Sequence, residues 1–420
     1  MEYFRRFKPR FPKFNIDSDY FWLVNKVHEL FEISVPISTN RYVRLSWFIL
    51  KIFSYLQYIY LMIQLFRLIS RSSSSVEEFM ASFNLCLTLT ASLARLFCLA
   101  FHRQTMLTLQ QYINSKNCQR DDSWAFELRK TTYERNVKFF ARFQLYAFCN
   151  SAFWCFTEFR KVEAFQIPFV LDWMPPTLKH CVEIFNSFVG IVWSFVCFLN
   201  FTQFATILNS LRTELAIIVK QFENIFFLSV SKYALDPTEI ANLNLQEKEF
   251  FWEELDSNLK LAIFHHSKFV KHYQQLRAVS STNFFILLSS ATVMITANVY
   301  LNLIQPSLGK IPLFIVAVQF MLEVVVCCTM FERLEQENDK IARHVYGIDW
   351  LHVAGKTTSA AQRRARKSIW QNALLVQRQV HGGGLKAKAG GMFELKRETS
   401  LRLINLVYSM LTFLLKAHGK

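Results

Sequence analysis

Long apolar runs separated by charged segments dominate the hydrophobic pattern of this 420-residue chain. A helix needs about 20 mostly apolar residues to cross the ~30 Å hydrocarbon core of a bilayer. The seven runs that come near this length are Trp47–Phe66, Phe79–Phe101, Phe139–Phe159, Cys181–Leu208, Asn283–Ile304, Ile311–Phe331 and Thr399–Leu415. The last run is short and contains Arg402, yet it reaches the lower limit for a span. The pattern predicts an all-α, multi-pass membrane protein with seven transmembrane helices.

The N-terminal segment sets the predicted orientation. Residues 1–46 contain no unbroken apolar stretch of signal-peptide length, so we expect a cytoplasmic N-terminus and, after seven spans, an extracellular C-terminus. The predicted order is a cytoplasmic segment (1–46), spans one to four (47–208), a cytoplasmic loop with helical extensions (209–282), spans five and six (283–331), a second cytoplasmic loop (332–398), the seventh span (399–415) and an extracellular tail (416–420).

The two longest connections contain apolar stripes at helical spacing. One stripe comprises Leu211, Leu215, Ile218, Phe222 and Ile225, and the other comprises Trp252, Leu255, Leu259, Ile263, His266, Val270 and Tyr273. An apolar stripe requires a partner surface. Packing of the two stripes against each other and packing against another subunit are both compatible with the pattern.

Composition agrees with a membrane environment. The chain is 52% hydrophobic and 19% charged, and it contains 43 phenylalanines. Its net charge of +16 is typical of nucleic-acid binding in a soluble protein, but in a membrane protein excess Lys and Arg marks cytoplasmic segments. The basic run Arg363, Arg364, Arg366 and Lys367 is therefore interpreted first as a retention signal or a contact with anionic lipid. Membrane lipid is an expected partner, and nucleic acid is not.

Motifs for catalysis or cofactor binding do not emerge from the sequence. Gly355-Lys356-Thr357 resembles the end of a phosphate-binding loop, but Trp350 occupies the position of the required first glycine. His265, His266 and His272 have no carboxylate or cysteine at ligand spacing beside them. We expect neither an enzyme nor a bound cofactor or metal.

Polar residues inside the apolar runs are the functional candidates. Arg95 and Glu323 lie deep in their runs, where they either pair or face water. A small apolar ligand needs a cavity with one or two hydrogen-bonding groups, although helix packing uses the same residue types. The candidate ligand-binding residues are Thr88, Phe148, Ser151, Trp154, Cys155, Trp193, Thr292, Thr296 and Tyr300.

The C-terminal region carries a series of short motifs in a fixed order. They are Phe331-Glu332-Arg333-Leu334, Tyr346, Asp349-Trp350, Ala389-Gly390-Gly391-Met392-Phe393, Leu395, Glu398-Thr399 and Tyr408-Ser409. In order and spacing this series resembles the C-terminal signature of the insect odorant receptor family. A second match covers Ile263 to Leu276, where His266 takes the position of the family's cytoplasmic histidine.

The resemblance implies a ligand-tuning subunit rather than the shared co-receptor. Such subunits have seven helices and an inside N-terminus, lie in the plasma membrane of olfactory sensory neurons, and assemble with the co-receptor as heterotetramers. A small volatile then opens a non-selective cation pore without a G protein. Carried onto this chain, the pore and gate positions are Tyr408, Thr412, Phe413 and Lys416, and the positions of the anchor between subunits are Trp252, His266, Tyr346 and Trp350.

One departure from the family pattern affects the pore. Ser400 stands where the family usually has phenylalanine, and Arg402 and Lys416 add positive charge near the conduction path. One such subunit among several hinders a cation less than a ring of four, so we expect poor conduction by this chain alone.

Two alternative receptor classes share parts of this pattern. An insect gustatory receptor has the same topology, but its last helix usually carries Thr-Tyr followed by Gln-Phe, whereas this chain has Val407-Tyr408-Ser409. A G-protein-coupled receptor requires an outside N-terminus and the Asp-Arg-Tyr and Asn-Pro-x-x-Tyr motifs, which do not occur at the expected helix ends.

Overall fold

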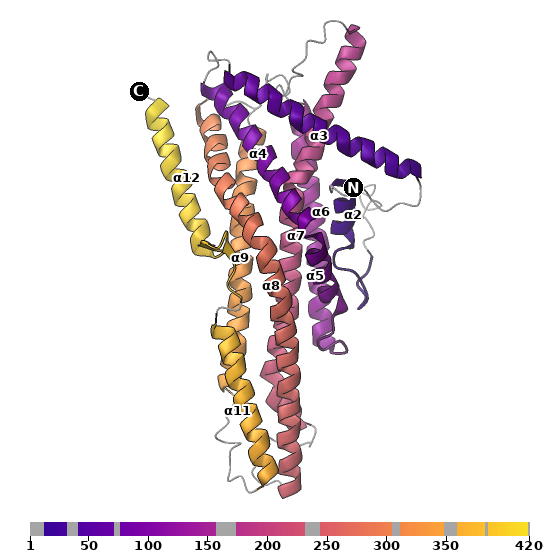
Figure 1. The fold of residues 1–420 in the computed structure, drawn as a ribbon, viewed down its shortest axis with the longest axis vertical. Helices are drawn as coiled ribbons and strands as arrows, with labels where there is room; N and C mark the ends of the chain where they lie inside the picture. The colour runs from indigo at the N-terminus through magenta and orange to yellow at the C-terminus, as the bar shows by residue number, and fades with distance from the viewer. Residues whose placement is uncertain are drawn as a thin grey trace, which may run out of the picture.

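Long helices running roughly side by side make up most of the molecule (Figure 1). The computed structural model describes residues 12–31, 41–70, 76–156, 174–231, 244–304, 311–347, 359–382 and 385–418; within these ranges some side chains, mainly those of 153–156 and 180–197, lie outside the description. The helices are α2 (Trp22–Phe31), α3 (Arg41–Ser70), α4 (Val76–Phe101), α5 (Arg103–Ser115), α6 (Ser123–Phe156), α7 (Pro176–Ser231), α8 (Leu245–Ile304), α9 (Ile311–Gly347), α11 (Ala360–His381) and α12 (Arg397–His418).

Short polar side chains begin several of these helices. At the start of α8, the Asn244 side chain accepts from the Glu247 amide (2.9 Å) and the Glu247 side chain accepts from the Asn244 amide (3.0 Å). This reciprocal arrangement is a capping box, which satisfies two backbone donors that lack helical partners. Ser359 caps α11 by accepting from the Ala361 amide at 3.1 Å.

Five helices of the described residues are long and apolar enough to cross a membrane. They are Arg41–Leu68, Ser82–Phe101, Gln246–Ile304, Phe314–Gly347 and Arg397–Ala417, which correspond to the first, second, fifth, sixth and seventh expected spans. The third and fourth expected spans fall on α6 and α7. The expected end of the third span, residues 157–159, and many side chains of the fourth lie outside the described part.

The helices α7 and α8 are far longer than a bilayer is thick. At 1.5 Å per residue, their 56 and 60 residues extend over about 84 and 90 Å. The two stripes identified in the sequence pack within this extension in one continuous core, with the Phe222 ring edge-on to His266 at 6.2 Å. The two stripes therefore pack within one chain, while Ile263 and Val270 of the second stripe stay partly exposed.

A two-stranded hairpin is the departure from an all-helical fold among the described residues. Strands β1 (Lys388–Ala389) and β2 (Phe393–Glu394) pair in antiparallel register, with Ala389 opposite Phe393. Gly390 and Gly391 both have positive φ, at 57° and 74°, as the centre of a type I′ turn requires. The Gly390 amide also donates to the Ser281 carbonyl on α8 at 2.9 Å, so the hairpin is attached to the bundle through its turn.

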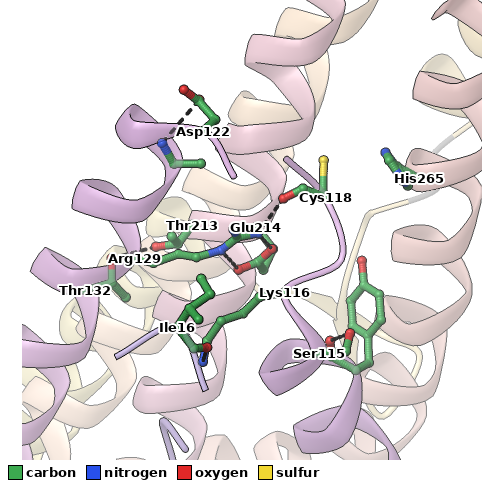
Figure 2. Close-up of polar contacts among 12 residues, drawn as sticks. Ile16, Ser115, Lys116, Cys118, Asp122, Arg129, Thr132, Thr213, Glu214 and His265 are labelled. Carbon is green, nitrogen blue, oxygen red and sulfur yellow. Dashed lines mark hydrogen bonds and ion pairs between the residues drawn. The ribbon is translucent and has the colours of Figure 1, made fainter. Parts of the chain in front are cut away.

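The N-terminal segment is fastened to the connection between α5 and α6. The Lys116 ammonium donates to the carbonyls of Ile16 and Ser18, both at 2.6 Å, and lies over the rings of Phe14 and Tyr20 at 5.4 and 5.0 Å. Figure 2 shows Lys116 reaching toward Ile16. Lys116 itself has φ 46° and ends α5 in the left-handed conformation.

A buried ion pair joins α6 to α7 beside this segment (Figure 2). The Arg129 guanidinium meets Glu214 in a two-point contact, Nε to Oε1 at 2.9 Å and Nη2 to Oε2 at 2.7 Å. The same Nη2 donates to the Cys118 carbonyl at 2.7 Å, which fixes the loop before α6. One turn later the hydroxyls of Thr132 and Thr213 are 2.7 Å apart, so polar contacts continue along the α6–α7 seam.

Substitution of Gly390 tests the hairpin turn. A Cβ at Gly390 would lie 2.6 Å from the Phe285 ring, whereas a Cβ at Gly391 meets nothing within 4 Å. We expect Gly391→Ala to lower the free energy of unfolding by about 1–2 kcal/mol through backbone strain, and Gly390→Ala to cost about 1–3 kcal/mol more through overlap. Thermal unfolding of the detergent-solubilised chain measures both. Adding Phe285→Leu should restore stability to Gly390→Ala but not to Gly391→Ala. Equal losses of unfolding free energy for the two glycine variants would contradict the close approach of Gly390 to Phe285.

Raising the pH tests the burial of Lys116. Burial lowers the pKa of Lys116 to about 8 from its ordinary value of 10.5, so the unfolded chain binds more protons than the folded chain between pH 8 and 10.5. The contribution of Lys116 to stability therefore rises with pH across that window, and a neutral amine keeps two donors for the two carbonyls. Thermal unfolding followed by Trp22 fluorescence should show this slope, and Lys116→Met should flatten it. Lys130→Met, at an exposed ion pair, is the control and should retain the slope.

Candidate functional site

A buried ion pair connects four helices within the apolar part of the bundle. Arg95 of α4 is 1% exposed and Glu323 of α9 is 2% exposed, and both terminal guanidinium nitrogens contact the carboxylate. Arg95 Nε also donates to Asn283 Oδ1 of α8 at 3.0 Å, and the Asn283 amide nitrogen reaches Asn200 Oδ1 of α7 at 3.3 Å. A charge in a membrane interior is costly unless it is paired and hydrogen-bonded, and this arrangement meets both conditions.

A seam of polar contacts continues from the ion pair along α4 and α8. Thr88 Oγ1 lies 3.1 Å from Met294 Sδ, and the Asn84 amide nitrogen donates to Asn298 Oδ1 at 2.6 Å. Residue numbers rise along α4 as they fall along α8, so the two helices are antiparallel. The direction from Arg95 to Asn84 leads toward the end of the bundle expected to face outward.

The structure places the predicted ligand-binding residues unevenly. Thr292, Thr296 and Tyr300 follow one another on successive turns of buried α8, and the Thr292 and Thr296 hydroxyls bond to Leu288 and Thr292 carbonyls of their own helix. Thr88 faces the same helix through Met294. Phe148 on α6 is 48% exposed and is not part of this group. The remaining candidate side chains lie outside the described residues: Ser151, Trp154, Cys155 and Trp193.

Several buried amides of the site were not identified from the sequence. Their positions are Asn84, Asn200, Asn283, Asn298 and Gln319, all less than 5% exposed. A polar amide within an apolar run is the signal that points to them, because such a group needs an internal partner in a bilayer. The spacing of Gln319 and Glu323, one helical turn apart, gives the same indication on α9.

The predicted pore residues lie on a helix that leaves the bundle. In Figure 1, α12 stands apart from α9 and α8 toward its C-terminal end and joins them near its N-terminal end. Tyr408 and Phe413 are 70% and 72% exposed, Lys416 is exposed, and Thr412 is partly exposed. Within the described residues these side chains have no partner helix opposite them.

Acidic residues of α9 hold the start of α12. Glu332 Oε2 accepts from the Arg397 backbone amide at 3.0 Å, which caps the positive end of the helix dipole. Glu335 pairs with Lys396 at 3.5 Å just before the helix. The Phe331–Leu334 motif therefore contains the residue that fixes α12 to α9.

The predicted anchor residues divide between the interior and the surface. Trp252 and His266 are buried, and His266 Nε2 lies 2.8 Å from Asn338 Oδ1 on α9. Tyr346 is 80% exposed and remains accessible to a partner, and Trp350 lies outside the described residues. Trp252 and His266 therefore stabilise helix packing within one chain.

Replacing one partner of the Arg95–Glu323 pair should lower the free energy of unfolding more than replacing both. Glu323→Gln leaves a buried guanidinium without its counter-charge, and we expect a loss of about 3–5 kcal/mol in unfolding free energy. The double variant Arg95→Met, Glu323→Leu should recover most of that loss, because no charge stays buried. Thermal unfolding in detergent provides the measurement, and a double variant as unstable as the single one would refute this account.

Comparisons with known proteins address the fold and the family. No curated protein matches the chain. The insect olfactory receptor OR5 from Machilis hrabei in complex with eugenol superposes with a TM-score of 0.67 at 12% identity, covering 95% of this chain and all of that one. A second structure of the same receptor, whose description names no ligand, superposes with a TM-score of 0.65 at 11% identity and the same coverage. A family model described as 7tm Odorant receptor matches residues 75–408, most of the chain. The chain therefore belongs to the 7tm odorant receptor family and is not an enzyme.

Proposed function

We propose that this chain is the odorant-binding subunit of a ligand-gated, non-selective cation channel. A small volatile binds among the transmembrane helices, and the chain assembles with a co-receptor as a heterotetramer in the plasma membrane of olfactory sensory neurons. In the proposed topology the chain crosses the membrane seven times, with the N-terminus in the cytoplasm and the C-terminus outside. The family match and the fold shared with a receptor described in complex with eugenol support a volatile ligand.

The observation that carries the channel proposal is a polar stripe on α12. Polar residues recur every three or four positions along the whole helix, and all are exposed or partly exposed: Arg402, Asn405, Ser409, Thr412 and Lys416. At 100° per residue the stripe lies opposite Leu403 and Val407, which are buried against the bundle. A polar face turned away from its own bundle is unsuited to lipid and suited to a water-filled path.

The attachment of α12 gives the ligand a route to this path. The helix is 22 residues long, about 33 Å, which is enough to cross a bilayer. Its first turn is capped by Glu332 of α9, so movement of α9 is transmitted to the pore helix. Phe413 lies beside the polar stripe near the outer end and remains our candidate for the gate.

Charge on the stripe argues for a mixed assembly. Arg402 is partly neutralised by Glu398 at 2.5 Å, but within the described residues Lys416 makes no ion pair. Four copies would place a ring of ammonium groups around a cation path, whereas a co-receptor dilutes that charge. The exposed Tyr346 supplies a surface for contact between subunits.

Electrical recording tests the proposal. Cells that express the chain together with an insect co-receptor should give volatile-evoked cation currents, and cells that express the chain alone should give little. With Ser409→Cys or Thr412→Cys, an external charged thiol reagent should reduce the current, because both positions face the aqueous path. The control Val407→Cys faces the bundle and should be insensitive to the reagent.

Two outcomes would overturn the channel proposal. The first is a volatile-evoked current that disappears when G-protein signalling is blocked. The second is an N-terminal epitope that antibodies reach from outside intact cells, since the proposed topology places that end in the cytoplasm.

A further inference from the structure

Gln319 is a buried amide without hydrogen-bond partners in the membrane-spanning part of α9. Its side chain is 2% exposed, and neither Oε1 nor Nε2 has a partner among the described residues. A buried polar group that makes no hydrogen bond destabilises a protein, and a bilayer offers no water to compensate. An amide kept in this condition calls for a partner that the chain itself does not provide.

The position of Gln319 on α9 directs it toward α4 and α8. It precedes Glu323 by four residues, so the two side chains lie on one face of the helix, one turn apart. Glu323 contacts Arg95 of α4, and Arg95 in turn contacts Asn283 of α8. Gln319 therefore lies one turn outward of the ion pair, on the face of α9 that Glu323 turns toward Arg95.

Small residues share this layer. The contact of Thr88 with Met294 fixes the antiparallel register of α4 and α8, and three residues toward the ion pair it brings Ala91 level with Ala291. Both alanines are buried, at 6% and 0% exposed. At these two positions both helices therefore carry only methyl side chains.

Two more unpaired amide atoms lie farther along the seam. Asn84 Oδ1 and Asn298 Nδ2 have no partners among the described residues, although the two side chains already share one hydrogen bond. The seam therefore offers both donors and acceptors outward of the ion pair. It offers no net charge there, because Arg95 and Glu323 neutralise each other.

We propose that the seam between α4, α8 and α9 binds the hydroxyl group of a neutral volatile alcohol, with Gln319 as its hydrogen-bonding residue. This assignment rests on the proposed function and specifies its ligand class. A hydroxyl donates a hydrogen bond to Gln319 Oε1 and accepts one from Nε2. A ketone oxygen accepts from Nε2 only, and an alkane forms neither hydrogen bond. Acids and amines are disfavoured because the seam has no free counter-charge.

The same helix connects this position to the pore helix. Glu332, which caps α12, follows Gln319 by 13 residues, about 20 Å along α9. An alcohol bound at Gln319 thus contacts the element that holds the first turn of α12.

Recordings on the chain with its co-receptor test the ligand class. The probes are straight-chain alcohols, methyl ketones and alkanes of four to ten carbons. Gln319→Met keeps the length of the side chain and removes both polar atoms, and we expect it to raise the half-maximal concentration of active alcohols about tenfold while changing that of alkanes less than twofold. Gln371→Met is the matched control, because it makes the same chemical change on the exposed face of α11 and should change neither. An unchanged ratio of alcohol to alkane sensitivity overturns the inference and leaves the channel proposal intact.

Thermal unfolding of the purified chain tests the site without any current. Removal of an unpaired buried amide should make Gln319→Met at least as stable as the parent chain. The alcohol panel should raise the unfolding temperature of the parent chain and not of Gln319→Met. If volatiles evoke no current even with the co-receptor, this selective shift still supports the site while the channel proposal fails. Equal shifts for both chains, or a clear loss of stability in Gln319→Met, would show a structural amide and overturn the inference.

Discussion

The pairing of Arg95 with Glu323 is the constraint around which the bundle is arranged. Each charge alone is intolerable in an apolar interior, so α4 and α9 must stay in one relative position for the pair to form. Asn283 and Asn200 extend the requirement to α8 and α7 through the amide contacts around the guanidinium. Apolar packing allows helices to slide and rotate at modest cost, whereas this network specifies a single alignment of four helices.

A second, similar ion pair lies where the expected cytoplasmic extension begins. Arg129 and Glu214 join α6 to α7, and the guanidinium also donates to the carbonyl of Cys118. The N-terminal segment closes over this region through Lys116. The two pairs fix neighbouring seams of the bundle, so the long helices act as one scaffold for the polar layer around Gln319 and for the attachment of α12.

The sequence predicted the helices well and their contacts only in part. Apolar length and periodicity are local properties, which is why five expected spans and both apolar stripes correspond to described helices. The partner of Arg95 lies 228 residues away, and helix rotation, which a local pattern does not determine, decides whether the two meet. The same limit applies to the proposed ligand site: hydroxyls such as those of Thr88 and Thr292 stand out in the sequence, whereas the lack of partners at the Gln319 amide becomes visible only when its neighbours are known. The Gly390-Gly391 pair matches a family motif, but its role as a turn docked on α8 depends on the hydrogen bond to Ser281 and on the nearby Phe285 ring.

The one-ended attachment of α12 makes it a lever. Its fixed part runs from the capped first turn beside Glu332 to the buried side chains of Leu403 and Val407, and its free arm is the part after Val407, about 16 Å long. A tilt of about 10° at Val407 moves the far end by about 3 Å, while atoms near the hairpin move by only a fraction of an ångström. Slight rearrangements among tightly packed helices are in this way amplified into a displacement of about one atomic diameter at the free end of the helix.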